Sequence, residues 1–368
     1  MNAAMPVPLP SLPRDRHGRP LRDLRLSVIE ACNFRCPYCM PADRVPDSHG
    51  LDAASRMSFD EIEALVRGFV RVGATKLRLT GGEPLLRRGL PALLRRLSAI
   101  PGIEDLALTT NGSLLAGQAQ ALRDAGLRRI TVSLDALDPA RFRALSGGRG
   151  DVDKVLAGLE AAVAAGFGPI KLNCVVQRGV NEDDVEPLVA FAREHGHVPR
   201  FIEYMDVGTC NGWRRVGVVP SAELRDRIHA RWPLRPLEPG YRGEVAKRHA
   251  FVDGRGEVGF VSSVSAPFCG DCHRARQRAP RAIARLTRQR RPPSRRSNRS
   301  RIGVNTVASP AITPSRSAHA SAWSICRWVV ARCCANSRPT PIATMPSPIQ
   351  SSARRLANSC TADAEIAA

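Results

Sequence analysis

Residues 25–39 read Arg25-Leu-Ser-Val-Ile-Glu-Ala-Cys32-Asn-Phe-Arg-Cys36-Pro-Tyr38-Cys39, a short apolar run followed at once by three cysteines. Three thiolates can hold three irons of a 4Fe–4S cubane and leave the fourth iron open to a substrate or cosubstrate, whereas a fully ligated cluster only passes electrons. A structural zinc is the alternative, although zinc sites usually pair two CxxC or Cys/His elements. The spacing by itself leaves iron–sulfur and zinc both open.

Strand-like apolar runs alternate with helix-like segments along the chain. The alternation predicts strands at residues 24–29, 76–80, 105–109, 129–133, 170–176 and 200–204, with helices near 58–72, 90–97, 116–125, 153–165 and 182–195. Farther along, a helix is predicted near 222–230 and a strand at 259–264. The first of these helices opens with the capping box Ser58-Phe-Asp-Glu61. Six β/α repeats predict an α/β fold of parallel strands joined by right-handed crossovers.

Polar motifs fall at the carboxyl ends of these predicted strands or just beyond them. They are Lys76-Leu-Arg78-Leu-Thr-Gly81-Gly82-Glu83-Pro84, Thr109-Thr-Asn111-Gly112, Val-Ser133-Leu-Asp135, Lys171-Leu-Asn173 and Arg200-Phe-Ile-Glu203-Tyr-Met205-Asp206. In β/α barrels this rim is where catalysis is built. A single motif such as Thr-Asn-Gly is more often a plain turn. Motifs scattered by chance, however, would not all lie at the carboxyl ends of the predicted strands. Together they predict a functional site at that rim.

The CxxxCxxC spacing, with Tyr38 before its last cysteine, resembles the radical S-adenosylmethionine (SAM) enzymes. Taken with the downstream motifs and with Phe268-Cys269-Gly-Asp-Cys272-His-Arg274-Ala-Arg276, the chain is similar to the GTP 3′,8-cyclases of molybdenum-cofactor biosynthesis from about Leu24 to Arg276. The repeats and the resemblance imply an open parallel (β/α)6 partial TIM barrel at residues 24–218, after an N-terminal extension at 1–23. Residues 219–276 are expected to form a small C-terminal cap that carries the second cysteine pair.

The resemblance also implies the cofactors and the site residues. Cys32, Cys36 and Cys39 are expected to ligate a 4Fe–4S cluster whose open iron binds SAM, and the cofactors supply a 5′-deoxyadenosyl radical. Expected SAM contacts are Tyr38, Gly82, Ser133 and Met205. Expected GTP contacts are Arg25, Arg78, Thr109, Lys171, Arg274 and Arg276. A triphosphate needs several fixed cations, and guanidinium suits phosphate geometry better than ammonium.

Each of these residues also has an ordinary structural interpretation. A tyrosine or a lone methionine at a strand end is commonly a packed core side chain, and a single basic residue is commonly a solvated surface charge. Arg78 and Lys171 are stronger candidates, because their neighbours read as buried strand and the alternation directs their side chains inward. No residue is assigned as a catalytic acid or base.

The second cluster of the family begins at Cys269 and Cys272, but the chain departs from the pattern soon afterwards. The third cysteine is expected fourteen residues after Cys272, where the chain has Leu286, and the next cysteine is Cys326. The family's C-terminal glycine pair is replaced by Glu365-Ile-Ala-Ala. We therefore expect a second cluster that is absent or labile, and translation in a shifted frame beyond about Arg276.

Charge and composition separate the last part of the chain from the rest. Of the formal net charge of +21, sixteen arginines and only two acidic residues fall in residues 277–368, which also lack Phe, Tyr and Lys. Such a basic, low-complexity tail cannot bury enough apolar surface to offset its ordering entropy, so disorder is expected. A basic tail could bind nucleic acid, but this one lacks the interleaved aromatic residues of single-strand binders, which disfavours that role.

The remaining expectations concern location and partners. The sequence contains no run of 18 apolar residues, so no membrane span is predicted. The N-terminus does not have the pattern of a secretory signal, so none is expected. Clustered CxxC spacings among the eleven cysteines then favour metal binding in a reducing cytoplasm. Expected partners are GTP, SAM, an electron donor and the next enzyme of the pterin pathway, with a homodimer as a further expectation. Three alternatives stay open: another radical SAM enzyme with an auxiliary cluster, an inactive frame-shifted pseudo-enzyme, and a basic-tailed nucleic-acid-binding iron–sulfur protein.

Overall fold

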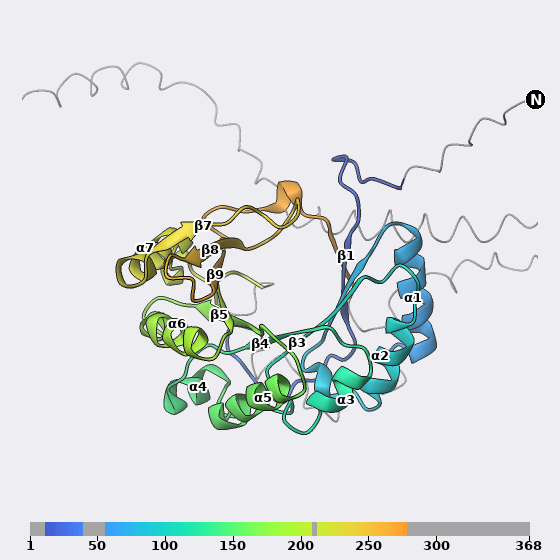
Figure 1. Ribbon diagram of the computed structural model, residues 1–368, viewed down its shortest axis with the longest axis horizontal. Helices are drawn as coiled ribbons and strands as arrows, with labels where there is room; N and C mark the ends of the chain where they lie inside the picture. Colours follow the sequence, from blue (N-terminus) through green and yellow to red (C-terminus); the bar gives the residue numbers. More distant parts are fainter. Residues whose placement is uncertain (1–11, 40–55, 208–211, 278–368) are drawn as a thin grey trace, which may run out of the picture.

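A single ten-stranded sheet organises the protein (Figure 1). The computed structural model describes residues 12–39, 56–207 and 212–277. Along the sheet the strands follow the order β10-β1-β2-β3-β4-β5-β6-β9-β8-β7. Their bounds are β1 Asp23–Ser27, β2 Lys76–Thr80, β3 Asp105–Thr110, β4 Arg129–Ser133, β5 Lys171–Val176, β6 Val198–Glu203, β7 Leu234–Pro236, β8 Lys247–Phe251, β9 Glu257–Val261 and β10 Arg274–Gln277.

Strands β1 to β6 pair in parallel in sequence order, which confirms the predicted β/α repeats. Two later strands extend the parallel part at its edges: β10 pairs with β1, and β9 pairs with β6. Strands β8 and β7 then add an antiparallel hairpin beyond β9. Within the described residues the sheet ends at β10 and β7 and does not close on itself, so the barrel is open.

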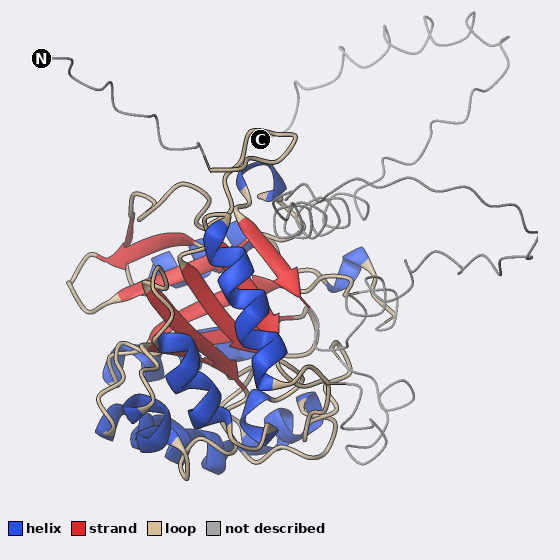
Figure 2. Ribbon diagram, turned by 90° about the vertical axis from the view of Figure 1, so that its right-hand side faces the viewer, coloured by secondary structure: helices blue, strands red, loops and turns tan. Residues whose placement is uncertain are grey.

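Helices lie along the outer side of the curved sheet (Figures 1 and 2). They are α1 Phe59–Arg71, α2 Leu90–Ser98, α3 Ala119–Asp124, α4 Pro139–Leu145, α5 Val152–Ala164, α6 Val185–Glu194 and α7 Ser221–Arg231, with short 3-10 turns η2 Pro84–Leu86, η3 Glu182–Asp184, η4 Arg215–Gly217 and η5 Cys269–Asp271. No helix in the described part of the chain is long and apolar enough to cross a bilayer.

The predicted capping box at the start of α1 is confirmed. Ser58 Oγ accepts from Glu61 N at 3.2 Å, and Glu61 Oε2 accepts from Ser58 N at 2.7 Å. These two bonds satisfy amide groups that a helix start leaves without partners. The helix then buries Ile62, Val66 and Phe69 on one face against the sheet.

Strand alternation divides the sheet into an apolar outer face and a polar inner face. In β1, Leu24 and Leu26 are 2% and 0% exposed under the helices, while Arg25 between them points the other way. The same alternation in β2 buries Leu77 and Leu79 outward and directs Arg78 inward. The inside of the barrel is therefore a polar lumen, and the hydrophobic core lies between sheet and helices.

Several elements were not predicted by the sequence: α4, β7, β8 and β10. The tail was expected to begin at residue 277, but Gln277 belongs to β10 and is 7% exposed. The run Arg274-Ala-Arg-Gln has little apolar alternation, so the sequence gives no sign of a strand there. Its place in the sheet is set by backbone pairing with β1. The rest of the expected tail, including Leu286 and Cys326, lies outside the described residues.

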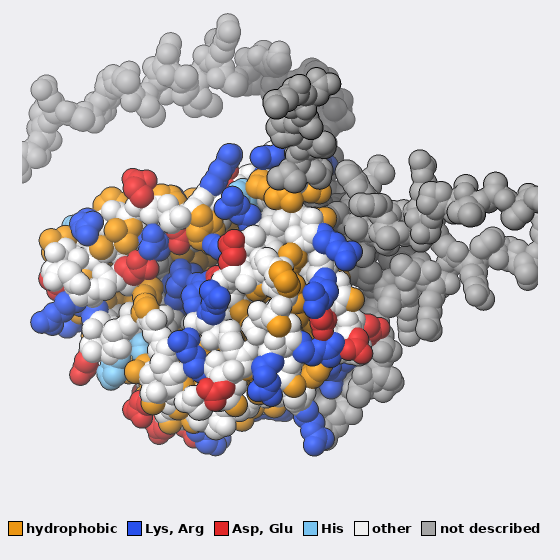
Figure 3. Space-filling model, turned by 45° about the vertical axis from the view of Figure 1, so that its right-hand side comes forward, with side chains coloured by type: hydrophobic (Ala, Val, Ile, Leu, Met, Phe, Trp, Pro, Cys, Tyr) orange, Lys and Arg blue, Asp and Glu red, His pale blue; other side chains and the backbone are white. Residues whose placement is uncertain are grey.

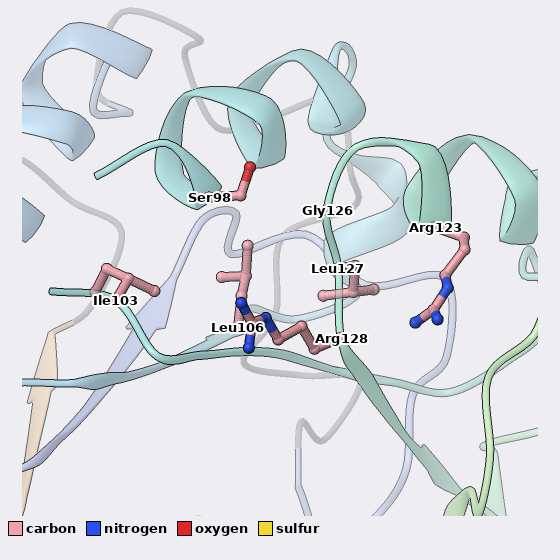
Figure 4. A pocket seen from close by; sticks show the side chains of 7 residues that line it. All are labelled: Ser98, Ile103, Leu106, Arg123, Gly126, Leu127 and Arg128. Atoms are coloured by element: carbon pink, nitrogen blue, oxygen red, sulfur yellow. The ribbon is translucent and has the colours of Figure 1, made fainter. Parts of the chain in front are cut away.

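A cavity of about 310 Å³ lies outside the barrel, between α2, α3 and the segments that enter β3 and β4 (Figure 4). Its lining residues are Ser98, Ile103, Leu106, Arg123, Gly126, Leu127 and Arg128. None of the predicted site residues lines this cavity. It sits at the amino-terminal end of the strands, away from the rim that carries the cysteines.

Candidate functional site

The start of the cysteine loop is fixed by the glycine-rich loop that follows β2. Gly82 N donates to Ile29 O at 2.8 Å, and Glu83 N donates to Ala31 O at 2.8 Å. A Cβ added at Gly82 would lie 2.3 Å from Ala31 O, so the two backbones approach as closely as only glycine allows. This contact places Cys32 at the carboxyl rim of the barrel.

Glu83 ties the loops after β2 and β3 together, a role that the sequence did not predict. Its side chain is fully buried and accepts from Leu85 N at 2.9 Å, Thr110 Oγ1 at 2.7 Å and Asn111 N at 2.7 Å. Burial raises the pKa of Glu83, although these hydrogen bonds act in the opposite direction. Asn111 is thereby held with its Nδ2 4.0 Å from Cys32 Sγ.

The three cysteines of the loop form no disulfide. Cys32 Sγ accepts from Phe34 N at 3.4 Å, and burial raises the pKa of the Cys32 and Cys36 thiols. Cys39 is exposed at the rim. Among the described residues, no three His, Cys, Asp or Glu side chains converge on a single metal ion. A cubane instead takes its cysteines on separate irons. Three thiols outside any disulfide, one of them with N–H donors beside its sulfur, are a donor set that fits such a cluster.

Tyr38 connects the cysteine loop to the opposite side of the rim. Its hydroxyl donates to Asp135 Oδ2 at 2.5 Å, while Asp135 Oδ1 accepts from Val175 N at 2.8 Å. Burial raises the pKa of Asp135 to about 6, against the lowering effect of these two hydrogen bonds. The carbonyl of Asp135 accepts from Asn181 Nδ2 at 2.9 Å, so the carboxylate is held on a fixed backbone. The role of Tyr38 toward SAM stays a prediction.

The other two expected SAM contacts also lie at the carboxyl rim. Ser133 is the last residue of β4, level with Asn173 of β5. Met205 follows β6 and is 40% exposed, so it is not a packed core methionine. Both side chains therefore belong to the same end of the barrel as the cysteines.

A row of cationic side chains lines the lumen below this rim. Arg25 and Arg78 are paired in register on β1 and β2, and Arg276 of β10 lies on the other side of Arg25. Arg78 Nη1 donates to Thr109 Oγ1 at 3.0 Å and to Thr131 Oγ1 at 2.9 Å. Burial, followed by the neighbouring arginines, lowers the pKa of Arg25 to about 9 and that of Arg78 to about 10. The lumen thus concentrates positively charged side chains that repel one another.

Lys171 extends this row from β5. Burial, then Arg200, Arg129 and Arg78, lower the pKa of Lys171 to about 7. Arg200 and Arg129 are lumen residues that the sequence did not predict as site residues, although inward positions on β6 and β4 would have indicated them. Arg129 pairs with Asp105, whereas Arg200 Nε is buried without a hydrogen-bond partner.

A larger hollow opens from this part of the lumen. A cavity of about 1020 Å³ reaches Arg129 and Lys171 and continues between the starts of β4, β5, β6 and β9. On the face shown in Figure 3, Lys and Arg side chains gather around a hollow. Of the expected GTP contacts, only Lys171 lines this cavity. Strand register and the Arg78–Thr109 hydrogen bond bring the contacts on β1, β2, β3 and β10 together, with Arg274 level with Asp23 at the start of β1.

The second cysteine pair lies near the other end of β1. Cys269 is exposed, Cys272 is half-buried, and Cys272 N donates to Cys269 O at 3.4 Å. The segment is docked by His273 O, which accepts from the backbone N of Arg22 and Asp23 at 3.1 and 3.2 Å. These two thiols are separated from the first three by the length of the lumen.

Glu203 anchors the chain that leads from the barrel to this pair. Its carboxylate is fully buried and accepts from Ser221 N at 2.8 Å, Val264 N at 2.7 Å, and both N and Oγ of Ser265 at 2.8 and 2.5 Å. Burial alone raises the pKa of Glu203, but the hydrogen bonds outweigh it and the pKa is lowered. The sequence motif contained this residue without revealing its partners.

An open parallel barrel with a CxxxCxxC loop at its carboxyl rim defines the radical SAM enzymes as the class of this protein. Accordingly, the model of the Radical SAM superfamily matches residues 26–192, and the model of Molybdenum Cofactor Synthesis C matches residues 198–280. The crystal structure of Streptococcus suis SuiB bound to S-adenosylmethionine aligns at a TM-score of 0.47 and 20% identity, over 58% of this chain and 48% of that chain.

Sequence relatives narrow the assignment. The chain is 74% identical over 263 residues to a GTP 3′,8-cyclase of Xanthomonas campestris pv. campestris (strain B100), covering 72% of this chain and 78% of the relative. It is 57% identical over 264 residues to a GTP 3′,8-cyclase of Acidothermus cellulolyticus, covering 72% of this chain and 73% of that relative. The chain belongs to the GTP 3′,8-cyclase family.

Proposed function

We propose that this chain cyclises GTP to 3′,8-cyclo-7,8-dihydro-GTP in molybdenum-cofactor biosynthesis. The observation that supports this most directly is the joint position of two features in one barrel. Three cysteine thiols stand at the carboxyl rim, and the row formed by Arg25, Arg78, Lys171 and Arg276 lines the lumen below them. A nucleoside triphosphate in this lumen would present its phosphates to the cations and its ribose toward the rim.

The site at the rim would hold the cofactors. When bound, the 4Fe–4S cluster and SAM supply the 5′-deoxyadenosyl radical. Cys32, Cys36 and Cys39 are the proposed iron ligands, and the proposed SAM contacts are Tyr38, Gly82, Ser133 and Met205. Phe34 N and Asn111 Nδ2 point hydrogen-bond donors at Cys32 Sγ, which stabilises sulfur in its anionic, metal-binding form.

The lumen would bind and orient GTP. Arg25, Arg78, Lys171, Arg274 and Arg276 are the proposed phosphate-binding cations, with Thr109 holding the Arg78 guanidinium at 3.0 Å. Because these cations are partly desolvated and repel one another, a polyanion that enters relieves an unfavourable arrangement. The attraction is stronger there than at a solvated surface, and it fixes the ribose relative to the rim.

The second cluster is proposed to be absent or labile, with cyclisation impaired. Cys269 and Cys272 supply two thiols, and the position of the expected third ligand is Leu286. A leucine cannot ligate iron, so the guanine end of the substrate would lack its iron contact. Cleavage of SAM at the first site does not depend on this pair.

Anaerobic reconstitution of the full-length chain tests the proposal. We expect about four irons per chain, from one cluster, with release of 5′-deoxyadenosine under dithionite and little or no cyclised nucleotide. About eight irons together with full cyclase turnover would contradict the proposed impairment. Absence of both a cubane spectrum and 5′-deoxyadenosine would contradict the radical SAM assignment of the site and favour an inactive chain.

The wider setting is also proposed. The enzyme would work in the cytoplasm with an external electron donor, would pass its product to the next enzyme of the pterin pathway, and would pair as a homodimer. The division into a barrel at residues 24–218 and a cap at 219–276 is part of the same proposal. Sequencing the nucleotides around codon 276 tests the frame-shift hypothesis, which fails if no small insertion or deletion restores a cysteine at the expected spacing.

A further inference from the structure

The connection between β7 and β8 carries an aromatic ring into the lumen from the far edge of the sheet. Lys76 begins β2, and its Nζ lies 3.6 Å from the centre of the Tyr241 ring. An ammonium over an aromatic face is attracted by the ring quadrupole. Burial, and then the charges of Asp23 and Glu244, raise the pKa of Tyr241, so the ring lies among charged groups at the start of the strands.

The same connection is fastened to the segment of the second cysteine pair. Gly243 has a φ of +85°, and a Cβ added there would lie 2.4 Å from Asp271 O. Beside it, Arg242 Nη2 lies 3.5 Å from Asp271 Oδ1. Asp271 ends the turn η5, between Cys269 and Cys272. The connection is therefore packed closely against the cysteine turn at Gly243, with an exposed ion pair beside this contact.

The connection is itself a closed turn, so its two contacts are linked. Gly240 N donates to Glu244 Oε2 at 2.8 Å, and Glu244 N donates to Tyr241 O at 3.2 Å. Arg248 of β8 pairs with Glu244 at 3.3 Å. A shift of Gly243 relative to η5 would thus be transmitted to the Tyr241 ring rather than absorbed along the segment. Figure 1 shows the chain that follows α7 returning to β1 along the open side of the barrel.

We propose that Tyr241 is a positioning residue for Lys76 in the binding of the substrate's polyphosphate, and that the turn of residues 240–244 couples this lysine to the Cys269–Cys272 segment. The proposal rests on the proposed role of the lumen as the triphosphate site. It adds a residue from outside the parallel strands to the control of that site.

The physical reason is preorganisation. A free lysine side chain loses rotamer entropy when it is fixed. A ring that already holds the ammonium removes part of this cost before the anion arrives, which tightens binding without a new contact to the ligand. The turn makes this positioning depend on whether the cysteine segment is docked.

Binding of inorganic tripolyphosphate to the full-length chain, measured by titration calorimetry, tests the first half. Tyr241→Leu should weaken the affinity by about fivefold, the size of a partly desolvated cation–π contact, whereas Tyr241→Phe keeps the ring and the affinity. Equal binding by wild type and Tyr241→Leu would overturn the positioning role. Equal weakening by Tyr241→Phe would show that the hydroxyl matters instead of the ring, which also overturns it.

A pair of glycine variants tests the coupling. Gly243→Ala and Gly254→Ala both place a Cβ at positive φ, +85° and +79°, but only Gly243 faces a close backbone oxygen. Gly243→Ala should weaken tripolyphosphate binding about as much as Tyr241→Leu does and should speed hydrogen exchange in residues 240–244 and 269–273. Gly254→Ala should change neither quantity. If Gly243→Ala does not fold, Arg242→Ala is expected to show the same two effects in weaker form.

The outcomes separate this inference from the proposed function. If the wild-type chain does not bind tripolyphosphate, the lumen is not the triphosphate site, and both proposals fail. If it binds but Gly243→Ala and Arg242→Ala match wild type in affinity and in exchange, only the coupling fails. Neither readout needs turnover or an intact second cluster.

Discussion

The hydroxyl of Tyr38 donates to Asp135 Oδ2 at 2.5 Å and so bridges 97 residues of sequence. Tyr38 stands between Cys36 and Cys39. Asp135 follows β4, and its Oδ1 accepts from Val175 N while its carbonyl accepts from Asn181 Nδ2. The loop that offers the thiols is therefore anchored to the barrel by its own aromatic residue. This contact fixes Tyr38, and with it the stretch between Cys36 and Cys39, relative to the barrel.

Removing this hydroxyl should loosen the loop. Tyr38→Phe leaves Asp135 Oδ2 buried without its donor, which should lower the free energy of unfolding by about 1–3 kcal/mol. Chemical denaturation measures the loss, and the EPR spectrum of the reduced cluster should broaden or weaken. The double variant with Asp135→Leu is the control, because it also removes the unpaired oxygen and should recover part of the loss. Full additivity of the two substitutions would refute the anchoring role.

Glu203 should contribute strongly to stability. Glu203→Gln turns an amide nitrogen toward groups that donate to the carboxylate, so we expect a loss of about 3 kcal/mol, as for hydrogen bonds to charged groups. The matched control is Glu223→Gln, whose half-exposed pair with Arg178 should be worth less than about 1 kcal/mol.

The pH dependence of this effect has a definite sign. The folded pKa of Glu203 lies below its usual 4.5, so its contribution is present above pH 4.5 and is lost as pH falls through the folded pKa. Denaturation of wild type and Glu203→Gln should therefore converge in acid. A gap between them that is constant down to low pH would contradict this assignment.

Lys171 should couple phosphate binding to proton uptake. Its pKa of about 7 means that the amine is largely neutral at pH 8, and a bound polyphosphate would favour the charged form. Calorimetric titration with tripolyphosphate in two buffers of different ionisation enthalpy should show uptake of up to about one proton at pH 8. Affinity should fall as pH rises through 7. Lys171→Met should abolish the uptake, and the exposed Lys154→Met should leave it intact.

The same shift affects stability without ligand. The unfolded chain keeps a proton on Lys171 up to its usual pKa of 10.5, whereas the folded chain releases it near 7. The unfolded state thus binds more protons between these values, so this residue makes the free energy of unfolding rise with pH in that window. Lys171→Met should flatten the rise, which denaturation at pH 7 and pH 9 can measure.

Gly82→Ala should disrupt the structure of the cysteine loop, and any effect on ligand binding should follow from that disruption. The added Cβ would lie 2.3 Å from Ala31 O, and such overpacking costs about 1–3 kcal/mol. We expect lower thermal stability and incomplete iron loading. Gly117→Ala meets nothing within 4 Å and should be neutral or slightly stabilising. A stable, iron-loaded Gly82→Ala chain that fails only to bind SAM would show that the ligand, and not the backbone contact, requires this glycine.

Local patterns predicted the barrel well. The strands Lys76–Thr80 and Arg129–Ser133 have the predicted bounds. Apolar and polar residues alternate in them with the two-residue period of a strand, and this pattern can be read from neighbouring residues alone. The capping box at Ser58 is confirmed for the same reason, since its partners are three residues apart. By contrast, β10 was not predicted, because its pairing partner β1 lies some 250 residues earlier and its own sequence has little apolar pattern.

The three-cysteine spacing, the six β/α repeats and the glycines that let two loops meet can all be found in the amino-acid sequence, because each depends on residues close together in the chain. The choice of cations that share the lumen, the contact of Tyr38 with Asp135 and the contact of Tyr241 with Lys76 all arise from the folded arrangement. Those contacts join segments far apart in sequence, so they depend on sheet register and on where the open edge of the barrel lies. No local period encodes that information.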